Sequence, residues 1–491
     1  MKTSIQRLWA RGLGGTVVLG VVLMLFAVAA AQQPGELIIR NGLIVTATGR
    51  TEGDLRIRNG TIAEIGKGLQ AASGTREINA KGMLVLPGGI DPHVHLGPRP
   101  GMVGGDDYTT GSRAALAGGV TTIANFINQV ADEDLTTTLS KATALAKTQT
   151  IADVMLHATI SDPSMVTREA LANVAKGYSL KIFLSAPGFD PNVPQFLRLI
   201  RAAGQAGLLT MLHCEDAAIK ETVIERMMAE GRSAIRYFPE SRPVVSEEVA
   251  TQRCVAMSEV TGAPVYIVHV SSERALRSVE AGQARGLPVF AETRLLYLHL
   301  TKERFELPDA NIYTGTPPLR EKRDQDALWE GIAKGSIQVV ATDHSSYTRA
   351  EKMDPAVNIA NERPGGNFLQ ANLPLLYSQG VRTKRISLEQ MVAVTSTNPA
   401  KLFGLYPRKG TIAVGSDADL AIWDPKLKRT VRDEDQFSNA KFSVFAGWEV
   451  TGWPIVTIRR GEVVYEAGKI TAPAGSGEVV SSQHWQKPGR P

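Results

Sequence analysis

Cysteine, aromatic residues and clustered basic charge are all scarce in this sequence of 491 residues. Only Cys214 and Cys254 are present, which is too few for a disulfide framework, so a hydrophobic core must hold the fold. The net charge is +5, but no dense run of lysine and arginine occurs, which excludes a nucleic-acid-binding surface. With 43% hydrophobic and 21% charged residues, the composition is that of a globular protein rather than a disordered or polytopic one.

The first 31 residues differ from the rest of the chain. Three basic residues precede an uncharged apolar run at 17–31, which ends in small residues. This pattern predicts a secretory signal peptide cleaved after Ala31, and therefore a periplasmic or secreted protein that meets the membrane only during export. The alternative is an uncleaved N-terminal membrane anchor, although the run is shorter than the roughly 20 residues of a spanning helix.

Short apolar and β-branched runs occupy residues 32–83, and the same texture returns at 406–470. The pairs Asn41-Gly42 and Asn59-Gly60 predict hairpin turns in the first of these segments. Neither segment alone can bury its apolar face, so we expect one small discontinuous β-sandwich built from both chain ends. Residues 471–491 are rich in glycine, proline and serine and are expected to form a flexible tail.

Strand-like apolar runs alternate with helix-like segments between residues 84 and 405. This recurrence is typical of a parallel sheet covered by helices. In a domain of this length it predicts an α/β fold with a (β/α)8 barrel. The runs that we interpret as strands lie at 121–126, 154–160, 180–184, 207–212, 265–270, 288–291 and 338–341.

Metal-ligand residue types stand where the predicted strands end. His93 and His95 follow the apolar run 83–86, and two residues that are two positions apart on a strand point the same way. Catalytic groups in such barrels come from the carboxyl ends of strands. The other polar residues at these ends are Lys181, His213, His269 and Asp343. Because imidazole and carboxylate are natural ligands of zinc and similar ions, the pattern predicts a catalytic divalent-metal site.

Lys181 is the exception in this set, because an ammonium group repels a metal ion. Alternation along its strand sends Ile182 and Leu184 toward the helices and Lys181 into the barrel. Burial without a partner lowers the pKa of a lysine toward the neutral amine, which can react with carbon dioxide to form a carbamate. The alternative is a lysine paired with an internal acid.

Other candidates nearby have simpler interpretations. Cys214 follows His213 on the same strand, so it faces the other way and is expected to be a small buried hydrophobic residue. His344 should likewise diverge from Asp343. No comparable setting surrounds the remaining histidines, which we interpret as structural or surface residues: His157, His299 and His484.

Several separated motifs resemble the cyclic amidohydrolases, and among them the hydantoinases and dihydropyrimidinases. The similar pieces span nearly the whole mature chain and lie at 88–96, 106–111, 118–122, 213–215, 268–271, 317–320, 343–344, 396–407 and 409–420. The resemblance also covers Lys181 within its strand.

The resemblance implies a centre of two divalent metal ions, with zinc as the expected metal. One ion would be held by His93, His95 and Asp343, and the other by His213 and His269. Carboxylated Lys181 and a hydroxide would bridge them. The hydroxide would attack an amide carbonyl of a small cyclic substrate, while Asp343 shuttles the proton to the departing nitrogen. Relatives of this kind often form homotetramers, so the resemblance also implies a homo-oligomer.

Departures from the family pattern affect the expected substrate contacts. The tyrosine that donates to the oxyanion five residues after the lysine is replaced by Ala186, a loss that typically costs about 100- to 1,000-fold in rate. Thr316 is the expected substrate-binding hydroxyl residue. An asparagine of a later loop is missing around Pro364. The metal chemistry is therefore more firmly predicted than the identity of the ring.

Three alternative functions stay open at this point. Allantoinases use the same metal cage with a different pocket. Dihydroorotases usually carry an arginine two residues beyond the second histidine, where this chain has Gly97. Non-catalytic relatives such as the collapsin response mediators act in protein interactions but lack the metal ligands, which this chain keeps.

Overall fold

The computed structural model describes residues 35–97, 104–483 and 485–488, and the segment from Pro34 onward forms one compact unit. The predicted signal peptide at 1–31 lies outside the described residues. Within the described part, none of the helices combines the length and the apolar character needed to cross a bilayer.

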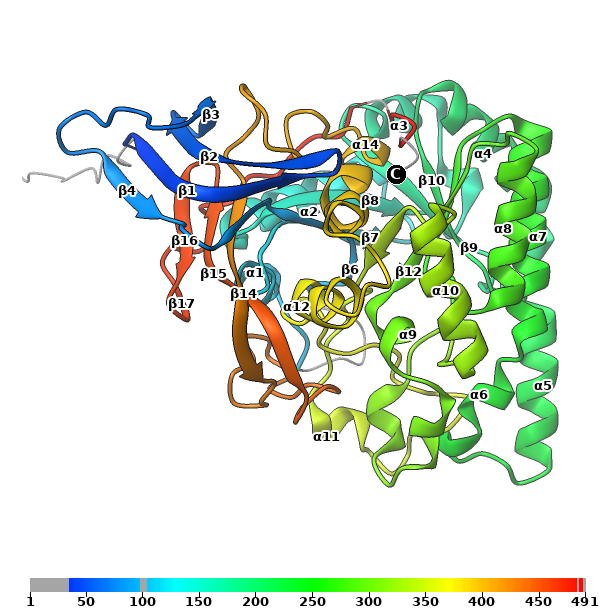
Figure 1. Ribbon diagram of the computed structural model, residues 1–491. Coiled ribbons are helices and arrows are strands. Elements are labelled where there is room, and N and C mark those ends of the chain that lie inside the picture. The colour runs from blue at the N-terminus through cyan, green and yellow to red at the C-terminus, as the bar shows by residue number, and fades with distance from the viewer. Residues whose placement is uncertain (1–34, 98–103, 484, 489–491) are drawn as a thin grey trace, which may run out of the picture. The chain divides into compact units, whose positions relative to one another are not determined.

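Parallel strands form a barrel in the order of the chain (Figure 1). Within the described residues it has eight: β6 (Gly89–Val94), β7 (Val120–Asn128), β8 (Asp153–Thr159), β9 (Tyr178–Phe183), β10 (Thr210–His213), β11 (Val265–Ile267), β12 (Val289–Arg294) and β13 (Val339–Ala341). The sheet closes where Val94 bridges His344, and the His95 N–H donates to the His344 carbonyl oxygen at 2.7 Å. The predicted (β/α)8 barrel is therefore confirmed.

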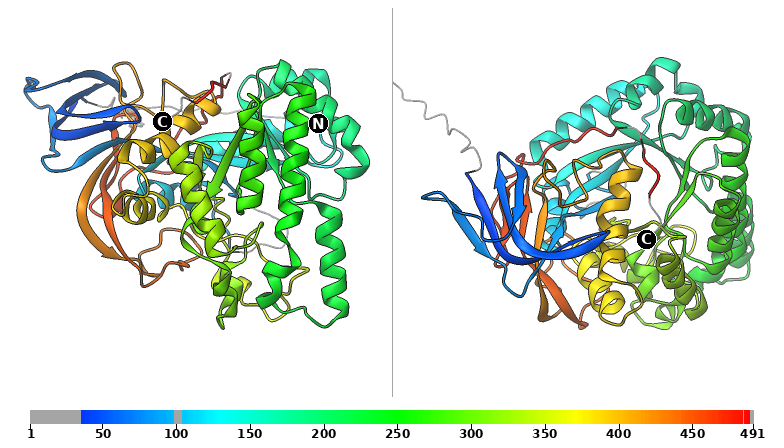
Figure 2. Two further views of the ribbon diagram at one scale, coloured as in Figure 1. Left: turned by 45° about the vertical axis from the view of Figure 1, so that its right-hand side comes forward. Right: turned by 45° about the horizontal axis from the view of Figure 1, so that its top comes forward.

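Helices follow the strands and surround the barrel, as the right-hand view of Figure 2 shows. Local signals set their ends: Asp107 caps the first of them through the Thr110 N–H, and Gly262 ends α7 at a φ of 68°. The helices are α1 (Tyr108–Ala117), α2 (Leu135–Gln149), α3 (Arg168–Val174), α4 (Val193–Gln205), α5 (Ala217–Ala229), α6 (Phe238–Ser241), α7 (Val244–Thr261), α8 (Glu273–Ala284), α9 (Leu295–His299), α10 (Lys322–Lys334), α11 (Arg349–Lys352), α12 (Asn372–Leu376), α13 (Leu388–Val392) and α14 (Asn398–Leu402).

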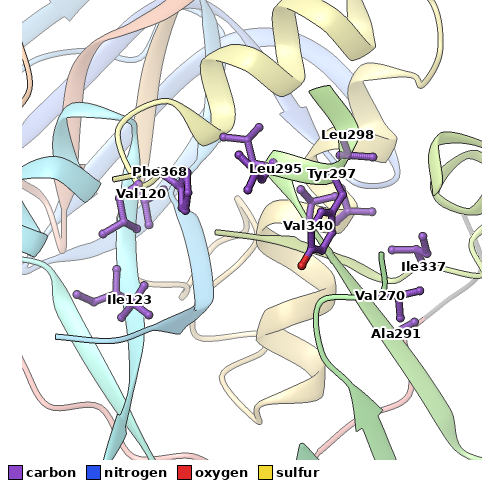
Figure 3. Packing of buried hydrophobic residues seen from close by; sticks show 14 of the residues in the cluster. Val120, Ile123, Val270, Ala291, Leu295, Tyr297, Leu298, Ile337, Val340 and Phe368 are labelled. Carbon is purple, nitrogen blue, oxygen red and sulfur yellow. The ribbon is translucent and has the colours of Figure 1, made fainter. Parts of the chain in front are cut away.

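Side-chain alternation along the strands separates two layers of the barrel core. Phe126 and Met211 belong to an inner cluster, whereas Ile123 and Ile182 belong to the layer beneath the helices. Figure 3 shows part of that outer layer, with Val120, Ile123 and Val340 labelled. Lys181 Nζ lies 5.2 Å from the centre of the inner Phe126 ring, so Lys181 faces inward as predicted.

A second sheet joins the two chain ends. Its nine strands within the described residues are β1 (Leu37–Thr46), β2 (Gly49–Arg58), β3 (Thr61–Gly66), β4 (Arg76–Asn79), β5 (Leu84–Pro87), β14 (Leu420–Thr430), β15 (Glu449–Arg459), β16 (Glu462–Glu466) and β17 (Lys469–Ile470). Strand β5 pairs with β1 on one side and with β14 on the other. Residues of both ends, among them Ile39, Leu55, Ile422 and Ile458, bury one shared apolar face. This agrees with the predicted discontinuous β-domain.

Two details of the expected β-layer differ from the structure. Residues 84–87 were expected to open the barrel, but β5 belongs to the second sheet, and the barrel starts at Gly89. Asn41-Gly42 is not a hairpin turn, because β1 continues through it as a bulge. The Asp54 carboxylate accepts the Asn41 N–H at 2.9 Å and so satisfies the backbone donor that the bulge takes out of the ladder. Asn59-Gly60 does connect β2 to β3 as expected.

The C-terminal segment packs against the barrel, contrary to the expectation of a flexible tail. Val154 donates its N–H to the Glu478 carbonyl oxygen at 2.8 Å, and the Val480 N–H donates to the Val154 carbonyl oxygen at 2.8 Å. Val480 is buried in the inner barrel cluster. Composition alone suggested disorder, but the few apolar residues of this segment find a partner surface that composition does not reveal.

Candidate metal centre

Three of the predicted ligands meet at the carboxyl ends of β6 and β13. Oδ1 of Asp343 lies 3.1 Å from His93 Nε2 and 3.0 Å from His95 Nε2. Ligand atoms of His93, His269 and Asp343 all lie within 4.8 Å of one another. Such convergence of two imidazoles on one carboxylate oxygen is the donor set that a divalent ion takes.

Glu292 holds the first of these histidines from the far side of its ring. Its Oε1 lies 2.7 Å from His93 Nδ1, and it also accepts the His269 N–H at 3.1 Å. The Tyr266 hydroxyl donates to Oε2 at 2.9 Å, so the carboxylate itself is fixed. A carboxylate behind a ligand imidazole fixes its tautomer and orientation, which leaves His93 Nε2 directed at Asp343.

His213 and His269 form the second half of the site. His213 Nδ1 lies 2.9 Å from His269 Nε2, and His213 Nε2 lies 2.9 Å from a Glu215 oxygen. Burial lowers the pKa of His213, and burial together with the neighbouring His213 lowers that of His269 well below its usual value. Two neutral imidazoles therefore face each other with nitrogen atoms that a cation can take as ligands.

Lys181 lies fully buried between aromatic rings. Its Nζ is 5.2 Å from the Phe126 ring and 4.9 Å from the Phe183 ring. Among the described residues Nζ has no hydrogen-bond partner, so the interpretation of a lysine paired with an internal acid is wrong. Burial lowers the pKa of Lys181 from 10.5 to about 8, against the pull of Glu292 and Asp343. The amine is thus partly neutral near physiological pH, as the reaction with carbon dioxide requires.

Asp343 itself has an unusual backbone and an unexpected partner. Its φ is 50° and that of His269 is 41°, both in the left-handed region that non-glycine residues rarely adopt. Nη1 of Arg294, at the end of β12, lies 3.2 Å from Asp343 Oδ2. Burial opposes ionisation of this carboxyl, but Arg294 and His93 outweigh it and hold the pKa of Asp343 well below its usual value.

The site opens into a cavity of about 150 Å³. Besides the histidines and Asp343, it is lined by Phe183, Thr316, Ser345, Tyr347 and Pro364. Thr316, the expected substrate-binding residue, and Pro364, near which the asparagine of the family is missing, both line this cavity. The lining does not include Ala186, which lies in the turn after β9 with its N–H donated to the Phe183 carbonyl oxygen at 3.3 Å.

Three of the residues set aside from the sequence have side-chain partners outside the proposed ligand set. His344 bonds to Asp106 at 2.9 Å and diverges from Asp343 as expected. His157 is buried between Ser179 and the Pro92 carbonyl oxygen. Cys214 is buried with its Sγ 3.2 Å from that of Cys254. His484 lies outside the described residues.

Sequence reasoning missed the partners that orient the ligands. Glu292 and Arg294 stand at the end of the run 288–291, where a polar residue at a strand end could have been noticed. Glu215 lies two residues after His213, and its carboxylate contacts the His213 ring. Tyr347 and Ser345 carried no signal, because they reach the cavity through the loop after β13 rather than through a strand end.

Similarities to known proteins agree with this geometry. Residues 84–464 match the model of the amidohydrolase family. A D-hydantoinase from Ralstonia pickettii is 35% identical over 462 residues, which cover 92% of this chain and 100% of that protein. A crystal structure of dihydropyrimidinase from Brevibacillus agri superposes with a TM-score of 0.87 at 34% identity, covering 92% of this chain and 100% of that one. The L-hydantoinase from Arthrobacter aurescens gives a TM-score of 0.83 at 28% identity, over 91% of this chain and 99% of that one.

The barrel, the strand-end histidines and these similarities together show that the chain belongs to the amidohydrolase family, in its hydantoinase and dihydropyrimidinase group. It is therefore a hydrolase of carbon–nitrogen bonds.

Proposed function

We propose that this protein opens a cyclic amide, such as a hydantoin or a dihydropyrimidine, by metal-dependent hydrolysis. The observation that carries the proposal is the convergence of two histidines on Asp343 Oδ1, beside a facing pair of buried histidines. The names of the relatives, D-hydantoinase and dihydropyrimidinase, support the substrate class.

The donor groups fit two divalent ions, with zinc as the proposed metal. His93, His95 and Asp343 would hold one ion, while His213 and His269 would hold the other. The buried amine of Lys181 would form an N–C bond to carbon dioxide and lose a proton, and the resulting carbamate would supply a carboxylate ligand to the ions. Bound ions of this kind supply Lewis acidity, which polarises a carbonyl and lowers the pKa of water toward neutrality.

Asp343 is the proposed proton carrier. Its carboxylate would take a proton from the attacking water and deliver it to the departing ring nitrogen. Because Arg294 and His93 hold the pKa of Asp343 low, the protonated form is a strong acid and releases its proton readily. Asp343→Asn, assayed at metal concentrations that saturate the variant, should therefore lose about 100- to 10,000-fold in kcat.

The cavity walls would select the ring. Phe183 and Pro364 provide apolar surface, and the hydroxyl groups of Thr316, Ser345 and Tyr347 provide polar contacts. We propose that Thr316 contacts the substrate directly. The absence of a hydroxyl at Ala186 means that another donor must stabilise the developing oxyanion, or that the ring differs from the usual one.

The direct test incubates metal-loaded protein with hydantoin, dihydrouracil, allantoin, dihydroorotate and linear amides, and follows ring opening by chromatography. We expect turnover of the hydantoin or dihydrouracil class. Turnover of allantoin or dihydroorotate alone would assign one of the two alternative cyclic amidohydrolases. Failure with every compound, in protein that carries its metals, would favour a non-catalytic interaction protein.

Export and assembly remain proposals from the sequence. We propose that residues 1–31 direct the chain out of the cytoplasm and are then removed, and that the mature protein is a homo-oligomer, with a tetramer as the expected state. N-terminal sequencing and light scattering of the purified native protein test both.

A further inference from the structure

Arg294 is a fully buried charge next to the proposed metal site. It stands at the end of β12, and its side chain is 0% exposed. Its only carboxylate partner within 4.0 Å among the described residues is Asp343, whose Oδ2 lies 3.2 Å from Nη1. Burial of an arginine is unfavourable in free energy unless the charge is paired, so the contact with Asp343 fixes the position of the guanidinium.

The surroundings of Arg294 hold the guanidinium in one place. Nη1 also donates to the Tyr297 hydroxyl at 3.3 Å, and that hydroxyl donates to the Pro317 carbonyl oxygen at 2.5 Å. The guanidinium carbon lies 5.2 Å from the Tyr297 ring and 5.5 Å from the Phe368 ring. Figure 3 shows both aromatic side chains within the packed layer under the helices. The arginine is therefore pre-organised, as a planar guanidinium on aromatic faces usually is.

Gly315 leaves room for this arrangement. A Cβ at position 315 would lie 2.8 Å from Arg294 Nη1 and 3.3 Å from Nη2. These atoms are the far end of a flexible side chain, so an alanine at 315 would displace the guanidinium and leave the backbone in place. The loop that carries Thr316 thus packs directly on Arg294.

The two oxygens of Asp343 have different partners. Oδ1 faces His93 and His95, whereas Oδ2 faces Arg294. The Asp343 carboxylate could rotate about the bond to its Cβ if only one of its oxygens were held. Arg294 removes that freedom.

We propose that Arg294 is a positioning residue that holds Asp343 Oδ2, so that Oδ1 is presented to the metal bound by His93 and His95. The inference rests on the proposed metal site, but metal binding can test it without any substrate. It also links the cavity wall to the ligand set, since hydrogen bonds connect Pro317, Tyr297 and Arg294, and an ion pair connects Arg294 to Asp343.

The test measures cobalt or zinc affinity of Arg294→Ala by competition with a chromophoric chelator, beside wild type. Loss of a residue that orients a metal ligand typically costs about 10- to 100-fold in metal affinity or activity, and we expect a loss of that size for the ion at His93 and His95. Arg294→Lys keeps the charge but not the planar guanidinium that packs against the Tyr297 and Phe368 rings, so its metal affinity should fall between those of wild type and the alanine variant.

Gly315→Ala provides an independent variant that keeps the arginine. It should reproduce the weaker metal binding, because its Cβ displaces Nη1. Gly188→Ala is the matched control: its nearest neighbour is the Ser161 carbonyl oxygen at 3.5 Å, an ordinary contact, so metal affinity should stay at the wild-type level. Added guanidinium ion, at concentrations below those that unfold the protein, should restore metal binding to Arg294→Ala but not to Gly315→Ala.

The outcomes separate orientation from charge. Unchanged or tighter metal binding in Arg294→Ala, in a variant with wild-type circular dichroism, would overturn the proposal, because the guanidinium would then act only as a repelling charge or as a packing group. Wild-type affinity in Arg294→Lys would equally overturn it. If wild type turns over no cyclic amide, the proposed function is wrong, but these metal-binding results still test the positioning role of Arg294.

Discussion

At the scale of the residue, Lys181 has the most unusual chemical environment. Its amine is buried between Phe126 and Phe183 and has no hydrogen-bond partner among the described residues. Such a lysine does not stabilise the fold, because burial of an unpaired ammonium is unfavourable. In the proposed centre, formation of a carbamate would turn the same side chain into a metal ligand.

Lys181→Ala should reduce the rate of hydrolysis by more than about 100-fold. Even the mutation of a residue that only orients a metal ligand lowers metal affinity or activity by about 10- to 100-fold. The cavity left by the side chain should let a short-chain carboxylic acid such as propionate restore part of the rate. Steady-state assays with and without the acid measure both effects. Lys220→Ala, which removes only a bond to the Ser185 carbonyl oxygen, is the control. Undiminished turnover in Lys181→Ala would mean that this lysine serves only the fold.

His157 predicts a pH dependence of stability. Burial lowers the pKa of His157 from 6.5 to about 3, so between these values the unfolded chain binds a proton that the folded chain excludes. The free energy of unfolding should therefore fall as pH drops through this window, by up to about 1.4 kcal/mol per pH unit. Melting temperatures at fixed ionic strength measure the slope, which should be shallower in His157→Asn. Equal slopes in the two proteins would contradict this account.

The role of a residue could be predicted from the sequence only where the residue itself carries the chemistry. The histidines and Asp343 follow apolar runs, and their roles depend on their own chemistry. Glu292 and Arg294 act through the group that they touch, and contacts across the barrel, such as the 2.7 Å contact of Glu292 with His93, depend on closure of the sheet. No local pattern encodes such a pairing.

At the scale of the element, the recurring apolar runs predicted the barrel strands well. Strand β8 (Asp153–Thr159) is buried at every position, so its apolar run was unmistakable. Asn41-Gly42 was misinterpreted because a glycine after an asparagine serves a bulge as well as a turn. A Cβ at Gly42 would lie 2.5 Å from a Val85 methyl, so close packing of β5, rather than a turn, explains the glycine.

The C-terminal segment gives a prediction at this scale. Ending the chain after Gly477 removes buried Val480 and its hydrogen bond with Val154, and exposes the inner barrel cluster around Phe403. Burial of one valine side chain is worth about 1.5–3 kcal/mol, so the truncated protein should unfold at a clearly lower denaturant concentration. Equilibrium unfolding followed by circular dichroism measures this. An unchanged midpoint would show that the segment adds nothing to the stability of the barrel.

At the scale of the whole molecule, buried charges tie the barrel to the second sheet. Lys409 Nζ lies 2.6 Å from both Asp153 of β8 and Asp419, which precedes β14, and Asp153 also accepts the Glu478 N–H at 2.9 Å. These carboxylates could be taken for a cation site, but the lysine already occupies the position of the cation. The sequence predicted that both chain ends build one β-domain, whereas this link needed the folded structure.

We propose that the strand-end histidines, Asp343 and Lys181 together hold two divalent ions, and that hydrolysis requires these ions. The most direct measurement is the metal content of native protein, purified from zinc-supplemented medium without chelators, with ring opening assayed on the same preparation before and after chelation. We expect two equivalents of divalent metal per chain, and activity that disappears when the metal is removed and returns on reloading. Protein without stoichiometric metal, or activity that survives complete chelation, would contradict it.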